Sequence, residues 1–306
     1  MYHSISDFQN VSRPILTTGT FDGVHFGHKI IIDRLKEIAK NQNGETVLLT
    51  FSPHPRMVLF PDDHNLQLIN TLDEKIKLLE QAGIDHLIIH PFTKAFSRIT
   101  SMQFVRDIIV NELNTHKLVI GYNHHFGRNR EGSFEHLKEY APLYGFEVEE
   151  ISAQLIEDVS ISSTKIRNAL LSGDVSKAAD YLGYNYPLQG QVIEGHQIGR
   201  TLGFPTANLK VLDGSKLIPK DGVYAVHVKV KGQPFKGMMN IGNNPSLISK
   251  KHSLEVHIFD FDSDIYNQHI QVRFIKRIRK EISFDNLDAL KIQLEQDEDT
   301  AKAILS

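Results

Sequence analysis

Apolar residues in the first half of the chain form two kinds of segment that follow each other in turn. Short continuous apolar runs, rich in β-branched residues, predict buried strands, and longer stretches with apolar residues three or four positions apart predict helices. One such stretch carries Ile31, Leu35, Ile38 and Ala39 on one face. Strands separated by helices predict a parallel sheet with helices on both faces. We expect strands at residues 15–18, 47–51, 86–90, 117–122 and 146–151, and further helices at residues 71–82, 100–113, 134–144, 163–171 and 176–182.

Two of these helices have a clear start signal. Thr71 is followed three residues later by Glu74, and Thr100 by Gln103, which is the spacing of a capping box. Gly83 follows the first of these helices and predicts its end, since glycine adopts the left-handed conformation of a helix C-terminus.

After Gly183 the pattern changes to alternation with a period of two. Residues 224–230 and 254–258 alternate apolar and polar side chains, and turns rich in Gly, Pro and Asn separate them. This pattern predicts an antiparallel β-barrel. A last helix is expected from about Asn286, with Leu287, Leu290 and Leu294. We place the domain boundary at 183/184, so that the domains cover residues 1–183 and 184–306.

Composition limits the function classes. The 306 residues are 41% hydrophobic and 23% charged, which suits two globular domains, and a net charge of -3 argues against a nucleic-acid partner. The absence of cysteine excludes disulfides, thiolate catalysis and cysteine zinc sites. Residues 1–10 show no secretory signal, and the apolar runs are too short to span a membrane, so we expect a cytoplasmic location. The oligomeric state is left open.

A glycine-rich turn with two histidines lies between the first strand and the next helix. Residues 19–28 read GTFDGVHFGH, so that His25 and His28 flank Gly27. Glycines permit a tight turn close to a ligand, and a helix N-terminus attracts phosphate. Both imidazoles could therefore stabilise charge on the α-phosphate of a nucleotide while pyrophosphate leaves.

Two other interpretations of these histidines are possible. The first is a glycine-rich turn with two surface histidines, and the strand before and the helix after it favour the phosphate site instead. The second is zinc. The 16 histidines are scattered, and His124 and His125 are adjacent rather than four positions apart, which argues against a zinc site.

A second phosphate-binding segment is predicted at residues 161–167, ISSTKIR. It places the hydroxyls of Ser163 and Thr164 at a helix start and the cations of Lys165 and Arg167 in the first turns. This arrangement suits β- and γ-phosphates. If the segment stood alone, an N-capped surface helix would explain it equally well.

The second half holds another candidate site at residues 199–208, GRTLGFPTAN. Thr206 and Asn208 offer two oxygens on one side of an extended chain, which suits Mg²⁺ carried in with ATP. Taken alone, the segment could also be a turn with an N-cap. Glu255 lies in an apolar strand. It is either a solvent-facing carboxylate or the general base that a kinase for an alcohol needs.

In their order and spacing, these segments resemble the bifunctional bacterial riboflavin kinase/FAD synthetases over nearly the whole chain. The resemblance implies a Rossmann-like nucleotidyltransferase domain, then a six-stranded riboflavin-kinase barrel with a C-terminal helix. It implies phosphorylation of riboflavin to FMN and adenylylation of FMN to FAD, with ATP as co-substrate and Mg²⁺ as cofactor. Riboflavin, FMN, ATP and FAD are then the partners. Further segments that carry the resemblance are residues 51–55, 121–132, 222–224, 240–246 and 254–261.

The resemblance also implies a role for individual residues. His25, His28 and Glu255 are the implied catalytic residues. The implied ATP site of the adenylyltransferase comprises Gly19, Phe21, Asp22, Gly27, Ser163, Thr164 and Arg167, and its flavin site Asn123, Phe126 and Arg130. The implied ATP site of the kinase comprises Gly199, Arg200, Gly203, Pro205, Thr206 and Asn208, and the last two also bind the metal.

One motif departs from the family. Its flavin-side motif commonly reads Gly-Tyr-Asp-Phe-Arg-Phe-Gly, whereas residues 121–127 read GYNHHFG. His124 and His125 thus replace an aromatic residue and a cation, which bears on how the adenylylation site holds the flavin.

Three alternatives accompany this interpretation. One is a nucleotidyltransferase for pantetheine phosphate, a polyol phosphate or nicotinamide mononucleotide, which would not need the second domain. Another is a riboflavin kinase with a weak or inactive adenylyltransferase domain. The third is a non-catalytic flavin sensor, and the presence of His25, His28, Thr206, Asn208 and Glu255 together argues against it.

Overall fold

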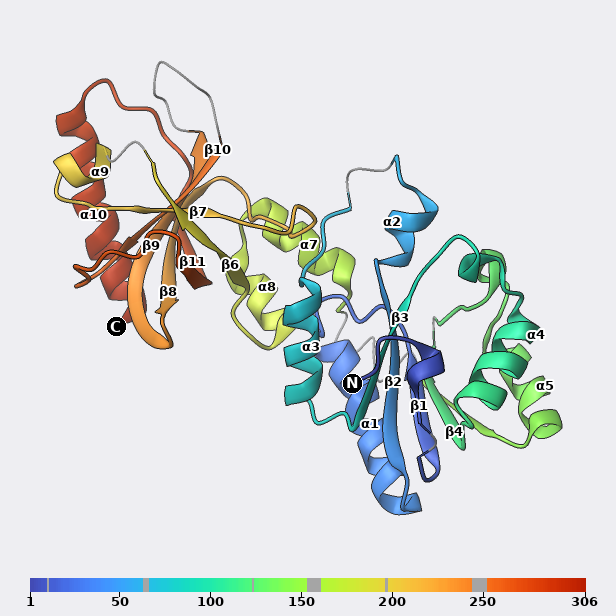
Figure 1. Cartoon of the computed structure of the whole chain (residues 1–306). Coiled ribbons are helices and arrows are strands. Elements are labelled where there is room, and N and C mark those ends of the chain that lie inside the picture. Colours follow the sequence, from blue (N-terminus) through green and yellow to red (C-terminus); the bar gives the residue numbers. More distant parts are fainter. Residues whose placement is uncertain (10, 63–65, 123, 153–160, 196–197, 244–251) are drawn as a thin grey trace. The chain divides into compact units, whose positions relative to one another are not determined.

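The computed structural model describes residues 1–9, 11–62, 66–122, 124–152, 161–195, 198–243 and 252–306. The chain divides into two compact units, Met1–Ser163 and Thr164–Ser306. Figure 1 shows the elements of both units along the chain. The division falls at 163/164, and our domain boundary at 183/184 stays a prediction. Among the described residues, no helix is both long and apolar enough to cross a membrane.

The first unit contains the predicted parallel sheet. Its five strands lie in the order β3-β2-β1-β4-β5, and every neighbouring pair is parallel. All five strands expected from the apolar runs are present. They are β1 (Pro14–Thr18), β2 (Glu45–Ser52), β3 (His86–Pro91), β4 (Lys117–Gly121) and β5 (Glu147–Ile151).

The helices predicted over residues 71–82, 100–113 and 134–144 begin within one residue of the expected start. Both capping boxes are formed, at Thr71 with Glu74 and at Thr100 with Gln103. The helix expected over residues 100–113 continues from Phe104 as a π-helix, whose wider turns place Phe104, Val105, Ile108 and Ile109 in the core. The helical elements are η1 (Ile5–Asp7), α1 (Phe26–Gln42), α2 (Pro55–Leu59), α3 (Leu72–Gln81), η2 (Phe96–Arg98), α4 (Ser101–Gln103), η3 (Phe104–Glu112), η4 (Arg128–Arg130) and α5 (Phe134–Tyr144).

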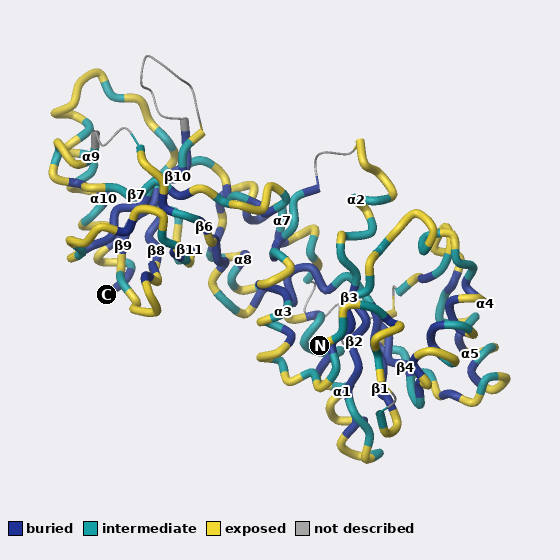
Figure 2. The backbone as a smooth tube through the Cα atoms, in the orientation of Figure 1, coloured by how far each residue is buried: buried dark blue, intermediate teal, exposed yellow. Residues whose placement is uncertain are grey.

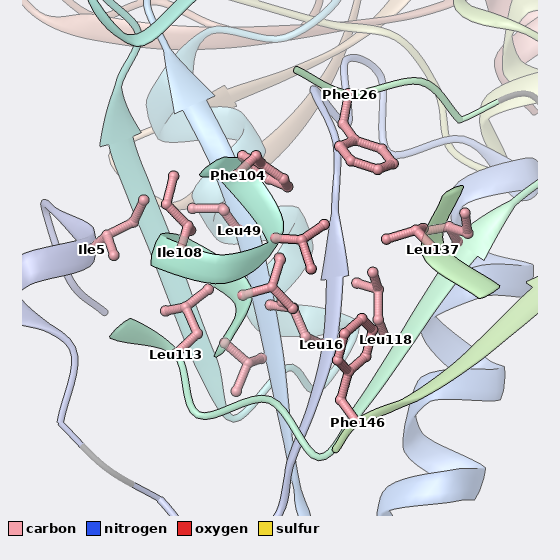
Figure 3. Close-up of a cluster of buried hydrophobic side chains, with 14 of the residues drawn as sticks. Ile5, Leu16, Leu49, Phe104, Ile108, Leu113, Leu118, Phe126, Leu137 and Phe146 are labelled. Carbon is pink, nitrogen blue, oxygen red and sulfur yellow. The ribbon is translucent and has the colours of Figure 1, made fainter. Parts of the chain in front are cut away.

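Helices cover both faces of this sheet, as expected. Successive residues of a strand point to opposite faces, so Ile15 packs with α1 while Leu16 packs with η3 and α5. Leu48 in β2 joins Leu79 of α3 on the α1 side. Figure 3 shows the larger cluster, between the sheet and η3, and Figure 2 shows that the central strands are buried.

The second unit contains the predicted antiparallel barrel. Its strands close in the order β10-β7-β6-β11-β8-β9. Helix α7 begins at the last residue of the first unit and is followed by α8. The elements are α7 (Ser163–Ser172), α8 (Val175–Leu182), β6 (Pro187–Ile193), α9 (Ile198–Thr201), β7 (Ala207–Lys210), β8 (Gly222–Val230), β9 (Gln233–Asn243), β10 (His252–Ile258), β11 (His269–Arg279) and α10 (Leu287–Leu305).

Helix α10 packs on the outside of the barrel through its C-terminal half. Ala301 and Leu305 are buried against Ala225 and Met238 of the barrel strands, whereas Leu287 at the start of the helix is exposed. Asp297 is 1% exposed, and its carboxylate accepts hydrogen bonds at 2.7–3.0 Å from the guanidinium of Arg279 at the end of β11. An ion pair between a buried carboxylate and a partly exposed guanidinium thus fixes the helix to the barrel.

We expect Asp297→Ala to lower the free energy of unfolding of the second unit by about 2 kcal/mol, because the partly buried guanidinium of Arg279 loses its hydrogen-bonded partner. Urea unfolding of the full chain, followed by circular dichroism, measures the change. The control is Asp299→Ala, an exposed carboxylate of the same helix, which should change stability by less than about 0.5 kcal/mol. Equal effects of the two substitutions would contradict the role of the ion pair.

Candidate active sites

The turn between β1 and α1 has an unusual backbone that buried side chains hold in place. Phe21 and Val24 have φ angles of 48° and 38°, a left-handed region that costs a non-glycine residue about 1–2 kcal/mol. Both side chains are almost completely buried, next to Leu79 and Leu48. Their burial offsets the cost, so the loop keeps one shape in front of the N-terminus of α1.

Asp22 connects this loop to two other parts of the unit. Its buried carboxylate accepts hydrogen bonds from the backbone N–H of Ile69 at 3.0 Å and of Asn70 at 3.2 Å. Its backbone carbonyl accepts a hydrogen bond from Ser163 Oγ at 2.8 Å. Two predicted ATP-site residues, Asp22 and Ser163, are therefore neighbours, although they lie 141 positions apart in the sequence.

His25 and His28 stack on each other at the start of α1. Their ring centroids are 3.7 Å apart with an interplanar angle of 16°, and Phe21 lies 4.9 Å from the His28 ring. Burial, followed by the charges of His25 and Lys75, lowers the pKa of His28 well below its usual range. Nδ1 of His28 has no hydrogen-bond partner among the described residues. The lowered pKa makes His28 a neutral imidazole at neutral pH.

A buried lysine that the sequence motifs did not reveal belongs to the same cluster. Lys75 of α3 donates from Nζ to Thr20 O, Thr50 Oγ1 and Phe51 O at 3.2–3.3 Å, so it joins the loop after β1 to the end of β2. Burial lowers its pKa to about 8, although Asp22 acts in the opposite direction. One signal was available: Lys75 lies four positions before Leu79, on the apolar face of its helix.

The other predicted residues of this site are only partly placed. Thr164 and Arg167 follow Ser163 in α7 but belong to the second unit, so their approach to the histidines stays a prediction. Asn123 lies outside the described residues. Phe126 is 7% exposed and packs against Phe104 in the core, whereas Arg130 is exposed.

The surroundings of His124 show what this residue contributes in place of the aromatic residue that is common in the flavin-side motif. Burial, followed by His125 and Arg130, lowers the pKa of His124 to about 4. Its ring stacks on Phe126 with centroids 6.2 Å apart. His124 is therefore an uncharged aromatic ring at neutral pH, and it resembles in this respect the aromatic residue that it replaces.

In the second unit, α9 ends at Thr201 and a tight turn leads from it to β7. Gly199 O accepts a hydrogen bond from Phe204 N at 2.8 Å, and a Cβ on Gly199 would lie 2.3 Å from Phe204 O, so only glycine fits. Gly203 has a φ of 89°. Phe204 is buried against the barrel, while Arg200 and Pro205 are exposed. The buried phenylalanine anchors a loop whose polar groups stay accessible.

Strand pairing brings the predicted kinase residues together. Asn208 of β7 is the register partner of Glu255 of β10, and Thr206 Oγ1 lies 3.4 Å from Glu255 Oε2. Ser253 Oγ donates to Glu255 Oε1 at 3.1 Å. The Glu255 side chain is only partly exposed, so it is not a freely solvated carboxylate. Hydroxyl and carboxylate oxygens meet here, next to the register partner Asn208, and oxygen donors are the ligands that hard divalent cations prefer.

The two folds and their sites define an enzyme with two phosphate-handling units. One has a histidine pair at a helix N-terminus beside a parallel sheet, and the other has a carboxylate beside a glycine-containing loop on a barrel. Residues 7–165 match the FAD synthetase family, and residues 182–305 match the riboflavin kinase family.

Full-length relatives agree with both matches. The chain is 38% identical to the bifunctional riboflavin kinase/FMN adenylyltransferase of Haemophilus influenzae, covering 95% of this chain and 94% of the relative. It is 36% identical to that of Listeria monocytogenes, covering 100% and 97%. The crystal structure of a macrolide-efflux protein from Streptococcus pneumoniae superposes with a TM-score of 0.88 at 32% identity, covering 98% and 97%.

The chain belongs to the bifunctional riboflavin kinase/FMN adenylyltransferases. It is an enzyme with both a riboflavin kinase and an FAD synthetase activity. The alternatives of a different nucleotidyltransferase, a single-activity kinase and a non-catalytic flavin sensor are not favoured.

We expect the rate of FAD formation from FMN to fall about tenfold between pH 7 and pH 9, because Lys75 carries its charge below a pKa of about 8 and loses it above. Initial rates from FMN measure the fall, and FMN formation from riboflavin, at the site in the other unit, serves as reference.

Lys75→Arg keeps a cation at high pH and should remove the fall. Lys77→Arg, an exposed lysine on the same helix, should retain it. If Lys75→Arg and the wild type lose activity at the same pH, the charge of Lys75 does not cause the fall.

Proposed function

We propose that Glu255 is the general base in the phosphorylation of riboflavin, and that His25 and His28 stabilise the transfer of AMP to FMN. One observation carries the proposal for the kinase: Thr206 Oγ1 lies 3.4 Å from Glu255 Oε2, and Asn208 is the register partner of Glu255. Thr206 lies directly before β7, Asn208 lies in β7 and Glu255 lies on β10, and strand pairing brings the two segments together at the edge of a glycine-containing loop.

In the kinase, an alcohol attacks the γ-phosphate and must lose its proton. Glu255 is suited to accept this proton because Ser253 holds one carboxylate oxygen and fixes its orientation. Thr206 and Asn208 would hold magnesium–ATP, and the metal when bound would neutralise charge on the phosphates. Gly199, Arg200, Gly203 and Pro205 would form the loop that lies along the nucleotide phosphates.

In the adenylyltransferase, the attacking group is a phosphate oxygen that is already anionic, so no base is required. Positioning and charge stabilisation then carry the reaction. The N-terminus of α1, a 17-residue helix, and the neutral imidazole of His28 provide hydrogen-bond donors for the α-phosphate, and pyrophosphate leaves.

The remaining site residues complete this proposal. Ser163, Thr164 and Arg167 would hold the β- and γ-phosphates, and Asn123, Phe126 and Arg130 would contact the flavin. We also propose that the domains divide at 183/184, as the start of the riboflavin kinase match at residue 182 supports. A cytoplasmic location is part of the proposal.

We expect His28→Ala to reduce FAD formation from FMN about 100-fold or more, because a donor to the transition state is lost. FMN formation from riboflavin should continue at the wild-type rate, because its site lies in the other unit. Separate initial rates from each flavin measure both. His3→Ala, an exposed histidine of the same unit, is the control and should change neither rate. Equal loss of both activities in His28→Ala would refute the assignment.

We expect Glu255→Gln to reduce FMN formation from riboflavin about 100-fold or more, because the amide keeps the shape but accepts no proton. FAD formation from FMN should hardly change, so the variant makes FAD from riboflavin only when FMN is added. Chromatographic separation of the flavins measures both reactions. Glu295→Gln, an exposed glutamate on α10, is the control. Full kinase activity in Glu255→Gln would refute the role of general base and leave Glu255 with a structural role only.

A further inference from the structure

His257 lies two residues after Glu255 on β10 and makes one specific hydrogen bond. Its Nδ1 is 2.7 Å from the backbone carbonyl oxygen of Pro205. A carbonyl oxygen only accepts hydrogen bonds, so Nδ1 must be the donor. The proton on Nδ1 is thus fixed by its partner, and the ring is oriented toward the loop that precedes β7.

The His257 ring is held from two sides. It is 9% exposed, and it lies between Phe204 and Phe259, with ring centroids 5.4 Å and 5.6 Å away in edge-to-face arrangements. Both phenylalanines belong to the cluster that packs against Ala301 and Leu305 of α10. The imidazole therefore has little freedom to turn. Its hydrogen bond to Pro205 holds this residue at a fixed distance from strand β10.

The bond extends the contact between two strands beyond the end of their ladder. The β7–β10 ladder pairs Asn208 with Glu255 and Ala207 with Val256. Pro205 lies just before this ladder, and Thr206 lies between the ladder and the His257–Pro205 bond. Thr206 is thus fixed on both sides along the chain, and its Oγ1 reaches Glu255.

We propose that His257 is a positioning residue for phosphoryl transfer: its Nδ1–H holds the Pro205 carbonyl and so places Thr206 against Glu255. This inference rests on the proposed function of Thr206 and Glu255. His257 does not contact the reacting groups, and its effect passes through the loop. A displacement of about 1 Å in such a group can cost about 100-fold in rate, so a single lost hydrogen bond has a measurable consequence.

Three substitutions separate the hydrogen bond from the packing. Asn branches at Cγ as His does, so His257→Asn can place an amide N–H where Nδ1–H was, although it leaves part of the aromatic gap empty. His257→Gln carries its amide one bond further out. His257→Phe fills the gap and has no donor.

We expect kcat/KM for riboflavin phosphorylation to fall about tenfold or more in His257→Phe and His257→Gln, and to stay close to the wild type in His257→Asn. The KM for magnesium–ATP should rise in the first two variants. The order of the variants by thermal stability should differ from their order by activity. His257→Phe should be at least as stable as His257→Asn, because phenylalanine buries more apolar surface. A purely structural role would make activity follow stability.

The second reaction and Glu255 supply the controls. FAD formation from FMN should be unchanged in all three variants, which shows that the rest of the chain is intact. If Glu255→Gln lacks kinase activity while His257→Phe keeps it, the positioning role is refuted and the proposed function stands. If Glu255→Gln itself is fully active, the proposed function fails. Equal kinase loss in His257→Asn and His257→Gln would assign the effect to the ring and overturn the proposal.

Discussion

A loop that is to bind phosphate, as we propose for both units, is under one constraint: it has to leave its backbone accessible and still keep one shape. The loop after β1 meets it through Asp22, whose buried carboxylate accepts two backbone N–H groups, and through Phe21 and Val24, whose burial holds left-handed backbone angles. The loop before β7 meets it through buried Phe204 and the bond from His257 to Pro205. In each case, contacts to parts of the unit outside the loop hold the loop in place.

The two sites differ in electrostatics as their proposed chemistry requires. Around the histidine pair, burial keeps His28 neutral, and Lys75 is a buried cation whose pKa lies near 8. A developing negative charge on phosphate is stabilised in such surroundings. At the barrel site a carboxylate is oriented by two hydroxyl groups, from Ser253 and Thr206, and remains partly accessible. A proton acceptor for an alcohol needs this combination of orientation and access.

At residues 124–125 this chain has two histidines where the family commonly has an aromatic residue and a cation. A histidine in place of an aromatic residue would introduce a titratable group, but burial lowers the pKa of His124 to about 4. The ring stays neutral and stacks on Phe126, which itself packs in the core of the first unit. The packing around the motif is thereby kept without a second charge next to Arg130.

The sequence by itself determined the element types, because apolar periodicity follows directly from which faces are buried. The capping boxes at Thr71 and Thr100, all five parallel strands and the antiparallel barrel were predicted in this way. Sequence motifs also selected His25, His28, Thr206, Asn208 and Glu255, since glycines, histidines and oxygen donors in loops are visible without a structure.

Only the tertiary structure decided which side chains meet. Ser163 and Asp22 lie 141 positions apart, Lys75 reaches three acceptors on two segments, and His257 bonds to a carbonyl 52 positions away. The π-helical winding from Phe104 was also unforeseen, because the apolar pattern of residues 100–113 predicts a helix but not its type. Such contacts depend on register and on the closure of the barrel, and no local pattern in the sequence encodes them.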